Sequence, residues 1–476
     1  MTLKLKRGRE MSATFKEFDA IIVGSGQGGN PIAFALADAG WKIALAEGKH
    51  VGGSCINSGC TPTKTMIASA RIAHLTKRAT DYGVNSTPGS VNFLKVRQRK
   101  DSIVESFREG SRQRLLSTPN ITLLEGYARF IGKKQLEVEL AKGEKEFITA
   151  DRMIIDTGSS PSMPPIKGVD NVKALDSTSV MELDTLPDHL LVIGGGYVGL
   201  EFGQMFRRFG SKVTIVQRNK QLLPIEDQDV AEAIAEILRE DGINVLLCTD
   251  TREVNAHENE QISLTLDTGG KEQILSGSHL LVATGRAPNT SYLNPEATGI
   301  TLDKRGFVPV NEQLETSVPG IYAIGDVNGG PAFTHVSYDD HTILLKNILQ
   351  GGKADTSGRV LPYVVFLDPQ LGRVGLTEKE AVDHGYDYGV AKIPMNWVAR
   401  AIETDETRGL MKAIVDKKTD RIIGAAILGV EGGELMSAIQ IAMLGGVPYT
   451  VLRDGMFAHP TLSESFNKLF GSMEGS

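Results

Sequence analysis

Residues 18–47 decide the fold and read FDAIIVGSGQGGNPIAFALADAGWKIALAE. The pattern predicts an apolar strand, a glycine turn, an apolar helix that ends at Gly40, and a second strand that ends near Glu47. The turn carries the spacing Gly24-x-Gly26-x-x-Gly29. Together these elements predict a βαβ unit of the kind that binds a dinucleotide.

The chemistry of this turn suits a pyrophosphate. Backbone N–H groups and the positive end of the following helix point at the turn and attract an anion. Glu47 stands 23 residues after Gly24, where its carboxylate can accept hydrogen bonds from ribose hydroxyls. A glycine motif alone would also fit a tight helix–strand contact, but the strand, the helix and the acidic residue together favour a dinucleotide site.

The chain repeats this design at residues 189–218, HLLVIGGGYVGLEFGQMFRRFGSKVTIVQR. The second motif is Gly194-x-Gly196-x-x-Gly199, and in both units the glycine after the helix follows the first motif glycine by sixteen residues. The repeat predicts a second dinucleotide site in the same chain.

The two copies differ at the ribose position. Gln217 stands 23 residues after Gly194, and Arg218 follows it. No carboxylate is present there to favour a free 2′-hydroxyl, and a guanidinium can bind a 2′-phosphate. We therefore expect NADPH to be preferred, with NADH possible; the alternative is that Gln217 and Arg218 form only a solvated polar turn.

The remaining pattern completes an α/β fold class with two Rossmann-like dinucleotide-binding domains and a C-terminal α+β domain. A proline-rich crossover begins near residue 159, and strand-rich alternation starts near Pro362. Further cofactor contacts are predicted at Thr157, Gly158 and Gly285, in small-residue turns that follow apolar strands. The predicted segments are an extension at 1–17, a first dinucleotide domain at 18–160, a second at 161–285, the rest of the first at 286–352, and the final domain at 358–470.

Composition excludes several classes of partner. The chain has 476 residues, with 51 basic and 58 acidic side chains and a net charge of −7, so it offers no field to attract nucleic acid or an anionic membrane. Two uncharged stretches, 20–37 and 435–452, are interrupted by glycine, proline or polar residues and do not predict membrane spans. We expect a cytoplasmic protein.

Three cysteines are present, and two of them lie in residues 52–64, GGSCINSGCTPTK. Five residues of regular helix rise about 7.5 Å, more than the ~4.4–6.8 Å between the Cα atoms of a disulfide. A Cys55–Cys60 disulfide therefore requires a break in the helix, which Asn57 and Gly59 permit. Lys64 follows Cys60 by four residues and could stabilise its thiolate.

Other interpretations of the cysteines are weaker. A zinc site would need four ligands, and the third cysteine, Cys248, does not supply a second pair, so no metal site is predicted. Two inert core cysteines are the other alternative, which the glycine-rich surroundings disfavour.

Residues 457–464 read FAHPTLSE, and His459 is the histidine that proline follows. The fixed turn could let Glu464 hold the imidazole ring and raise its basicity, as a general acid–base requires. A histidine that is simply hydrogen-bonded in a core is the alternative.

These motifs, taken in order with IGD at 324–326 and HPTLSE at 459–464, resemble the class I flavoprotein disulfide reductases, or pyridine nucleotide-disulfide oxidoreductases. The family includes glutathione reductase, dihydrolipoamide dehydrogenase and mercuric reductase. The resemblance spans about Phe18 to Phe470 and looks closest to the mercuric-reductase-like branch that includes the reactive-chlorine resistance flavoprotein.

The resemblance implies the cofactors and a homodimer. FAD would lie on the first glycine motif, with Asp326 beside the flavin side chain, and a nicotinamide nucleotide on the second. Cys60 would face the flavin, and Cys55 would be the interchange thiol. His459 and Glu464 would come from the second subunit as acid and base.

It also implies that Lys64 pairs with Glu201 near the flavin, and that Tyr197 covers the nicotinamide side. The expected activity is electron transfer from NAD(P)H through FAD and the cysteine pair to a small disulfide or a metal ion. Dihydrolipoamide dehydrogenase or glutathione-reductase-like activity is an alternative, and a flavin-bound redox sensor or interaction protein is an alternative of another class. The predicted catalytic residues are Cys55, Cys60, His459, Glu464, Lys64 and Glu201; the predicted cofactor contacts are Gly24, Gly26, Gly29, Glu47, Thr157, Gly158, Asp326, Gly194, Gly196, Tyr197, Gly199, Gln217, Arg218 and Gly285.

Overall fold

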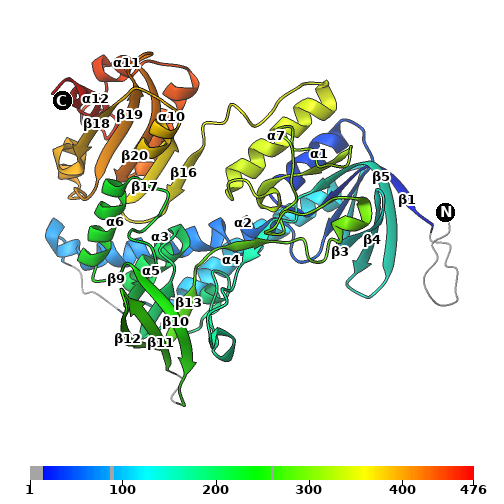
Figure 1. Ribbon diagram of the computed structural model, residues 1–476, viewed down its shortest axis with the longest axis horizontal. Helices are drawn as coiled ribbons and strands as arrows, with labels where there is room; N and C mark the ends of the chain where they lie inside the picture. Colours follow the sequence, from blue (N-terminus) through cyan, green and yellow to red (C-terminus); the bar gives the residue numbers. More distant parts are fainter. Residues whose placement is uncertain (1–13, 86–89, 259–260, 476) are drawn as a thin grey trace. The chain divides into compact units, whose positions relative to one another are not determined.

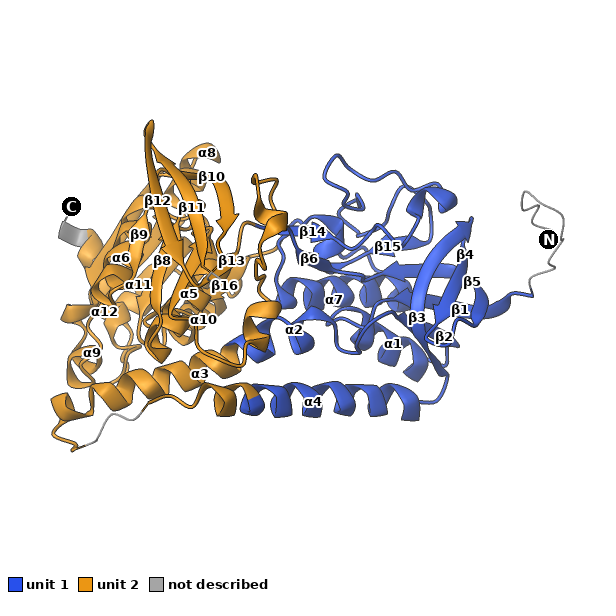
Figure 2. Cartoon of the chain, turned by 90° about the horizontal axis from the view of Figure 1, so that it is seen from below, with its two compact units in different colours: residues 1–63, 98–162, 285–358 blue, residues 64–97, 163–284, 359–476 orange. Residues whose placement is uncertain are grey.

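The computed structural model describes residues 14–85, 90–258 and 261–475. The chain divides into two compact units, coloured separately in Figure 2. Unit 1 comprises residues 1–63, 98–162 and 285–358, and unit 2 comprises residues 64–97, 163–284 and 359–476. Most of the predicted extension, residues 1–13, lies outside the described residues, and the first strand begins at Lys16.

Unit 1 contains a parallel sheet in the order β3-β2-β1-β5-β15, of which Figure 1 labels β1, β3 and β5. Its strands are β1 (Lys16–Val23), β2 (Ile43–Glu47), β3 (Ile121–Gly132), β5 (Lys145–Ile155) and β15 (Ile321–Ala323). The central strand β1 is buried along its carboxyl half, as its apolar run AIIV predicts. Val23 pairs with Ala46 on one side and Ile155 on the other, so the carboxyl ends of β1, β2 and β5 lie at one edge of the sheet.

Further elements complete unit 1. Helices α1 (Gly29–Asp38) and α7 (Thr334–Gln350) pack against each other, and β4 (Gln135–Leu140) pairs antiparallel with both β3 and β5. The short helix α2 spans Gly53–Asn57, and β6 (Ser159–Pro161) pairs with β14 (Arg286–Pro288). Two longer helices, α3 (Cys60–Lys77) and α4 (Phe93–Ser117), each contribute residues to both units.

The first part of unit 2 repeats the design of unit 1. Its parallel sheet has the order β13-β7-β8-β9, in which β7, β8, β9 and β13 take the places of β1, β2, β3 and β5. The antiparallel sheet β10-β11-β12 follows β9. The elements are β7 (His189–Ile193), α5 (Tyr197–Phe209), β8 (Lys212–Val216), α6 (Gln228–Glu240), β9 (Asn244–Leu246), β10 (Thr249–Ala256), β11 (Ile262–Thr268), β12 (Lys271–Gly277) and β13 (His279–Val282).

The last part of unit 2 is the predicted α+β domain. Five antiparallel strands have the order β16-β17-β20-β19-β18, and helix α10 packs on β16, β17 and β20. Strand β19 is buried along its whole length. The elements are β16 (Pro362–Val365), β17 (Gln370–Gly375), α8 (Glu378–Asp383), β18 (Tyr388–Pro394), α9 (Ala399–Glu403), β19 (Leu410–Asp416), β20 (Arg421–Gly429), α10 (Gly432–Leu444), α11 (Tyr449–Asp454) and α12 (Ser465–Gly471).

The predicted fold class is confirmed, with two Rossmann-like sheets and a C-terminal α+β portion. Along residues 14–85, 90–258 and 261–475, no helix combines the length and the apolar character that crossing a membrane would need. The finer segment boundaries given above stay predictions.

Candidate redox site and cofactor sites

The first glycine turn lies between β1 and α1 in unit 1. Gly24 has φ of +105°, and a Cβ there would lie 2.2 Å from the backbone oxygen of Asp156, so a larger residue does not fit. Glu47 ends β2, and its Oε2 accepts from Ser25 N at 3.0 Å and from Ser25 Oγ at 2.6 Å. The predicted ribose carboxylate therefore lies beside the turn.

The other predicted contacts of unit 1 lie in the turns after β5 and β15 and at Gly285, which directly precedes β14. Asp326 accepts from Ser159 Oγ at 2.5 Å, and Arg286 Nε lies 3.7 Å from the same carboxylate. Gly158 and Gly285 have φ of +66° and +144°.

Two buried polar atoms in this region support an FAD site. Thr157 Oγ1 and Asn30 Oδ1, the latter at the start of α1, have no hydrogen-bond partner among the described residues. A buried polar atom without a partner costs about 1–3 kcal/mol, and a polar ligand would supply one. With the glycine turn, Glu47 and Asp326, these atoms form a donor and acceptor set that fits FAD.

The cysteine segment, residues 52–64, does not form one continuous helix, as a Cys55–Cys60 disulfide would require. Helix α2 ends at Asn57, and α3 begins at Cys60. Asn57 holds the break, because its Nδ2 donates to Gly53 O at 2.9 Å and its Oδ1 accepts from Arg108 Nε at 2.7 Å. Cys55 is half-buried, and Cys60 is exposed.

Thr334 is a contact that the sequence analysis missed. It is the first residue of α7, and its Oγ1 lies 3.3 Å from Cys60 Sγ, within hydrogen-bond distance. Because 274 residues separate Thr334 from Cys60, no local pattern could reveal this contact.

The second glycine turn lies between β7 and α5 in unit 2. Gly194 has φ of +114°, and a Cβ at Gly196 would meet no described atom within 4 Å. Gln217 is buried; its Oε1 lies 3.4 Å from Gly195 N, and its Nε2 donates to Gln221 O at 3.2 Å. Arg218 is exposed. Gln217, at the predicted ribose position, therefore lies beside this turn.

Lys64 and Glu201 form the ion pair that the resemblance implied. Lys64 Nζ lies 2.6 Å from Glu201 Oε2, and the ammonium also lies 4.7 Å from the Phe366 ring centre. Glu201 is only 4% exposed, and its Oε1 accepts from Phe366 N at 2.8 Å. Tyr197 is half-buried at the start of α5, four residues before Glu201 and therefore on the same helix face.

His459 and Glu464 are also brought together. The Nδ1 atom of His459 lies 2.8 Å from Glu464 Oε2 and 3.1 Å from Glu464 Oε1. The carboxylate thus orients the ring, and the other ring nitrogen, Nε2, is left to exchange protons. The His459 side chain is 72% exposed, against 20% for Glu464.

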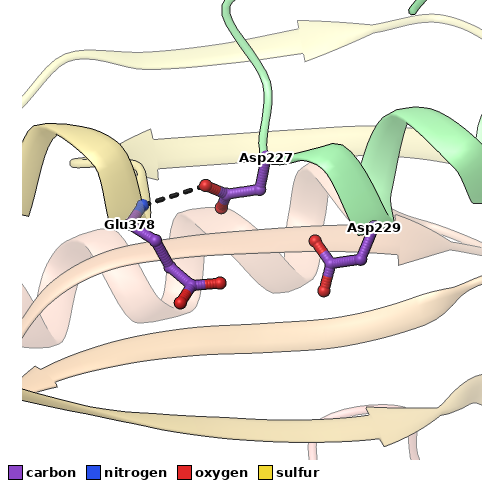
Figure 3. A group of neighbouring side chains, drawn as sticks. All are labelled: Asp227, Asp229 and Glu378. Atoms are coloured by element: carbon purple, nitrogen blue, oxygen red, sulfur yellow. Dashed lines mark hydrogen bonds between the residues drawn. The ribbon is translucent and has the colours of Figure 1, made fainter.

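A cluster of three carboxylates in unit 2 has the spacing of a cation site. Figure 3 shows Asp227, Asp229 and Glu378, whose oxygens lie within 4.8 Å of one another. The ammonium of Lys412 lies 2.9 Å from Asp229, 3.4 Å from Asp227 and in contact with Glu378. Because Lys412 supplies the countercharge, we interpret the cluster as an ion-pair network.

Comparison with known proteins shows the class of enzyme. The family described as "Pyridine nucleotide-disulphide oxidoreductase" matches residues 18–340, and its dimerisation domain matches residues 361–470. The chain therefore belongs to the pyridine nucleotide-disulphide oxidoreductases. Enzymes of this family depend on FAD and take electrons from NADH or NADPH, and so does this one.

Particular relatives share nearly the whole chain. It is 39% identical to the probable pyridine nucleotide-disulfide oxidoreductase RclA of Escherichia coli K12, over 95% of this chain and 99% of RclA. It is 35% identical to a mercuric reductase of Staphylococcus aureus, over 94% of this chain and 81% of that protein. A solved Cu(II) complex of the HOCl-induced flavoprotein disulfide reductase RclA has a TM-score of 0.87 at 38% identity, over 96% of this chain and 99% of that one.

Proposed function

We propose that the chain carries electrons from NADPH through FAD and the Cys55–Cys60 pair to a small disulfide or a metal ion. The observation that carries this proposal is the broken helix with two cysteines beside the first glycine turn, together with the His459–Glu464 pair. FAD, when bound, supplies the chemistry that converts hydride transfer from the nucleotide into electron delivery to sulfur.

The protein's residues would then act as follows. The Cys55–Cys60 disulfide accepts two electrons and one proton and opens to a Cys60 thiolate near Thr334 and a Cys55 thiol, whose proton passes to His459. The Cys55 thiolate attacks an acceptor disulfide and forms a mixed disulfide, while the leaving thiolate takes a proton from His459. Cys60 attacks the Cys55 sulfur, releases the second thiolate of the acceptor and restores the disulfide. One NADPH and one proton thus convert one disulfide into two thiols.

A metal ion would use the same two electrons. They reduce one Hg(II) to Hg(0) or two Cu(II) to two Cu(I), bound in each case through the soft cysteine sulfurs. The similarity to a mercuric reductase and to RclA, whose solved complex holds Cu(II), supports a metal acceptor. The same residues also serve lipoamide or glutathione disulfide.

The site is completed by a second copy of the chain in this proposal. The ring of His459 is largely exposed, as it would be if it reached the cysteines of a partner subunit, and residues 361–470 match a dimerisation domain. A cytoplasmic location fits the sparse cysteines, which would stay reduced there.

The test is NADPH oxidation by the purified holoenzyme with a panel of acceptors: glutathione disulfide, lipoamide, Hg(II), Cu(II) and a quinone. We expect turnover with at least one disulfide or metal ion, and its loss in Cys55→Ser. Cys248→Ser is the matched control, because Cys248 lies outside the cysteine segment, and it should keep full turnover.

Two results would contradict the proposal. Turnover in Cys55→Ser equal to the wild type would exclude electron transfer through the pair. NADPH oxidation limited to a single turnover with every acceptor would favour the redox-sensor alternative, because a sensor does not need the acid–base pair for repeated cycles.

A further inference from the structure

Asp156 is a buried acid of unit 1 that the proposed electron path does not use. It directly follows β5 and precedes Thr157. Its Oδ2 accepts from the backbone N–H of Gly29, the first residue of α1, at 2.8 Å. The carboxyl group therefore lies underneath the glycine turn that we assign to FAD.

The backbone comes close to this carboxyl group at three glycines. A Cβ at Gly26 or Gly29 would lie 2.7 or 2.9 Å from Asp156 Oδ2. On the other side, a Cβ at Gly325 would lie 3.3 Å from Asp156 Oδ1. Asp156 thus lies beside both motifs assigned to FAD: it is bonded to the helix that follows the glycine turn, and it leaves no room for a side chain at Gly325 without a shift.

The charges around Asp156 disfavour its ionised form. Asp326 follows β15, Asp340 lies on α7 with its Oδ2 bonded to Gly325 N at 2.7 Å, and Glu47 ends β2. No Lys, Arg or His forms an ion pair with Asp156 in the part of the chain that the structure describes. Burial first, and then these three carboxylates, raise the pKa of Asp156 well above its usual value, against the lowering effect of the Gly29 N–H.

A bound pyrophosphate would add another anion above the same carboxyl group. A carboxylate and a pyrophosphate at one water-poor site repel each other, whereas a neutral carboxylic acid can keep its bond to Gly29 N without that repulsion.

We propose that Asp156 is a positioning residue for FAD, which acts as a neutral carboxylic acid and joins the glycine turn to the Ile324-Gly325-Asp326 turn. This inference rests on the assignment of FAD to the first glycine motif. FAD binding and protonation of Asp156 are then linked, so ionisation of Asp156 in the flavin-free protein weakens FAD binding as the pH rises, by at most tenfold per pH unit.

The experiment measures FAD affinity between pH 6 and pH 9 by flavin fluorescence, in the wild type, Asp156→Asn and Asp156→Ala. Asparagine keeps the shape and the acceptor for Gly29 N but cannot ionise. We expect Asp156→Asn to bind FAD at pH 6 within threefold of the wild type and to lack the alkaline decline. Asp156→Ala should bind FAD at least tenfold more weakly at every pH, because Gly29 N loses its partner.

Asp19→Asn is the matched control. The Oδ2 atom of Asp19 accepts from Lys42 N at 2.7 Å, a bond of the same kind, but Asp19 is exposed and lies in the amino-terminal half of β1. This variant should keep both the affinity and the pH profile of the wild type.

Other outcomes would overturn the proposal. If Asp156→Asn binds FAD more tightly than the wild type and both proteins have the same pH profile, Asp156 is ionised over the whole range from pH 6 to pH 9. If Asp156→Asn does not fold, a wild-type FAD affinity that rises with pH would overturn the proposal by itself, because the ionised carboxylate would then be the form that binds FAD better. Glu47→Ala tests separately whether FAD binds at the first glycine motif. If neither Glu47→Ala nor Asp156→Ala changes the FAD affinity, FAD does not bind there. If Glu47→Ala alone weakens FAD binding, FAD binds there but Asp156 does not position it.

Discussion

Lys64 Nζ lies 2.6 Å from Glu201 Oε2, and the other oxygen of that carboxylate is bonded to Phe366 N. Helix α3 supplies the lysine, α5 the glutamate, and the chain after β16 the phenylalanine. One buried carboxylate thus fixes three separate elements of unit 2, so the pair should matter for stability.

We therefore expect Glu201→Leu to lower the free energy of unfolding by about 1–3 kcal/mol. This is less than the roughly 3–5 kcal/mol found when a fully buried pair loses one partner, because Lys64 is 30% exposed and water screens it. Chemical denaturation of the flavin-loaded protein measures the change. Asp383→Asn, which breaks an exposed pair with Lys379, should change stability by about 0.5 kcal/mol or less. Equal effects of the two variants would contradict the structural role of Glu201.

A second prediction concerns the Cys60 thiolate. Two-electron reduction should produce a long-wavelength charge-transfer band, which Cys60→Ser abolishes while FAD stays bound. Thr334→Val should move the appearance of the band to higher pH by roughly one to two pH units, because a hydrogen bond to a charged group is worth about 1.5–3 kcal/mol. Absorbance titration of the reduced protein tests both variants. A band that survives in Cys60→Ser would refute the assignment of this thiol.

His459 should control the proton-transfer step. His459→Ala is expected to lower disulfide turnover by roughly 10²–10⁴ while reduction of the flavin by NADPH stays fast. Stopped-flow absorbance separates the two steps. His384→Ala removes another exposed histidine of unit 2 and should leave both rates unchanged. Slow flavin reduction in His459→Ala would show that the histidine acts elsewhere.

Mixing subunits tests where His459 acts. A heterodimer of Cys55→Ser and His459→Ala chains contains one site with both residues intact if the histidine reaches across the two-fold axis. We expect each homodimer to be inactive and the mixture to recover turnover. No recovery, with the heterodimer confirmed by mass, would mean that each site is built within one chain.

The free energy of unfolding at acidic pH should depend on His74. Burial, and next the charge of Arg208, lower the pKa of His74 from 6.5 to about 4. Between these values the unfolded chain binds more protons than the folded chain, so the free energy of unfolding should fall as the pH falls through this window. His74→Gln should lose less stability than the wild type between pH 6.5 and pH 4.5, measured by denaturant titration. The same slope in both proteins would contradict this contribution, and exposed His384→Gln is the control.

Local spacing predicted the parts of the site that lie close together in the chain. The 23-residue spacing predicted that Glu47 lies beside its glycine turn, and the proline turn predicted that Glu464 contacts His459. Both predictions concern short segments, which can fold in few ways once their strands, helices and turns are defined. Asp156 and Thr334 could not be predicted. Their partners lie far away in the sequence, and only the packing of whole elements brings them together.

The 23-residue spacing also leads to a prediction about the choice of nucleotide. Gln217 Oε1 lies 3.4 Å from Gly195 N, as Glu47 Oε2 lies 3.0 Å from Ser25 N, so the two side chains occupy equivalent places beside equivalent turns. A carboxylate there would bind the 2′-hydroxyl of NADH and repel the 2′-phosphate of NADPH, whereas the amide of Gln217 does neither strongly.

We expect NADPH to be preferred about tenfold in kcat/KM, because exposed Arg218 can bind the 2′-phosphate and a charge-assisted contact is worth about 1.5–3 kcal/mol. The value lies at the lower end of the corresponding ten- to hundredfold range, because one exposed arginine is partly screened by water. The double variant Gln217→Glu, Arg218→Ala should reverse the preference toward NADH, measured as flavin reduction by each nucleotide. Arg252→Ala, which removes an exposed charge from β10, should leave the ratio unchanged. Equal or faster use of NADH by the wild type, or an unchanged ratio in the double variant, would mean that Arg218 is only a solvated turn residue.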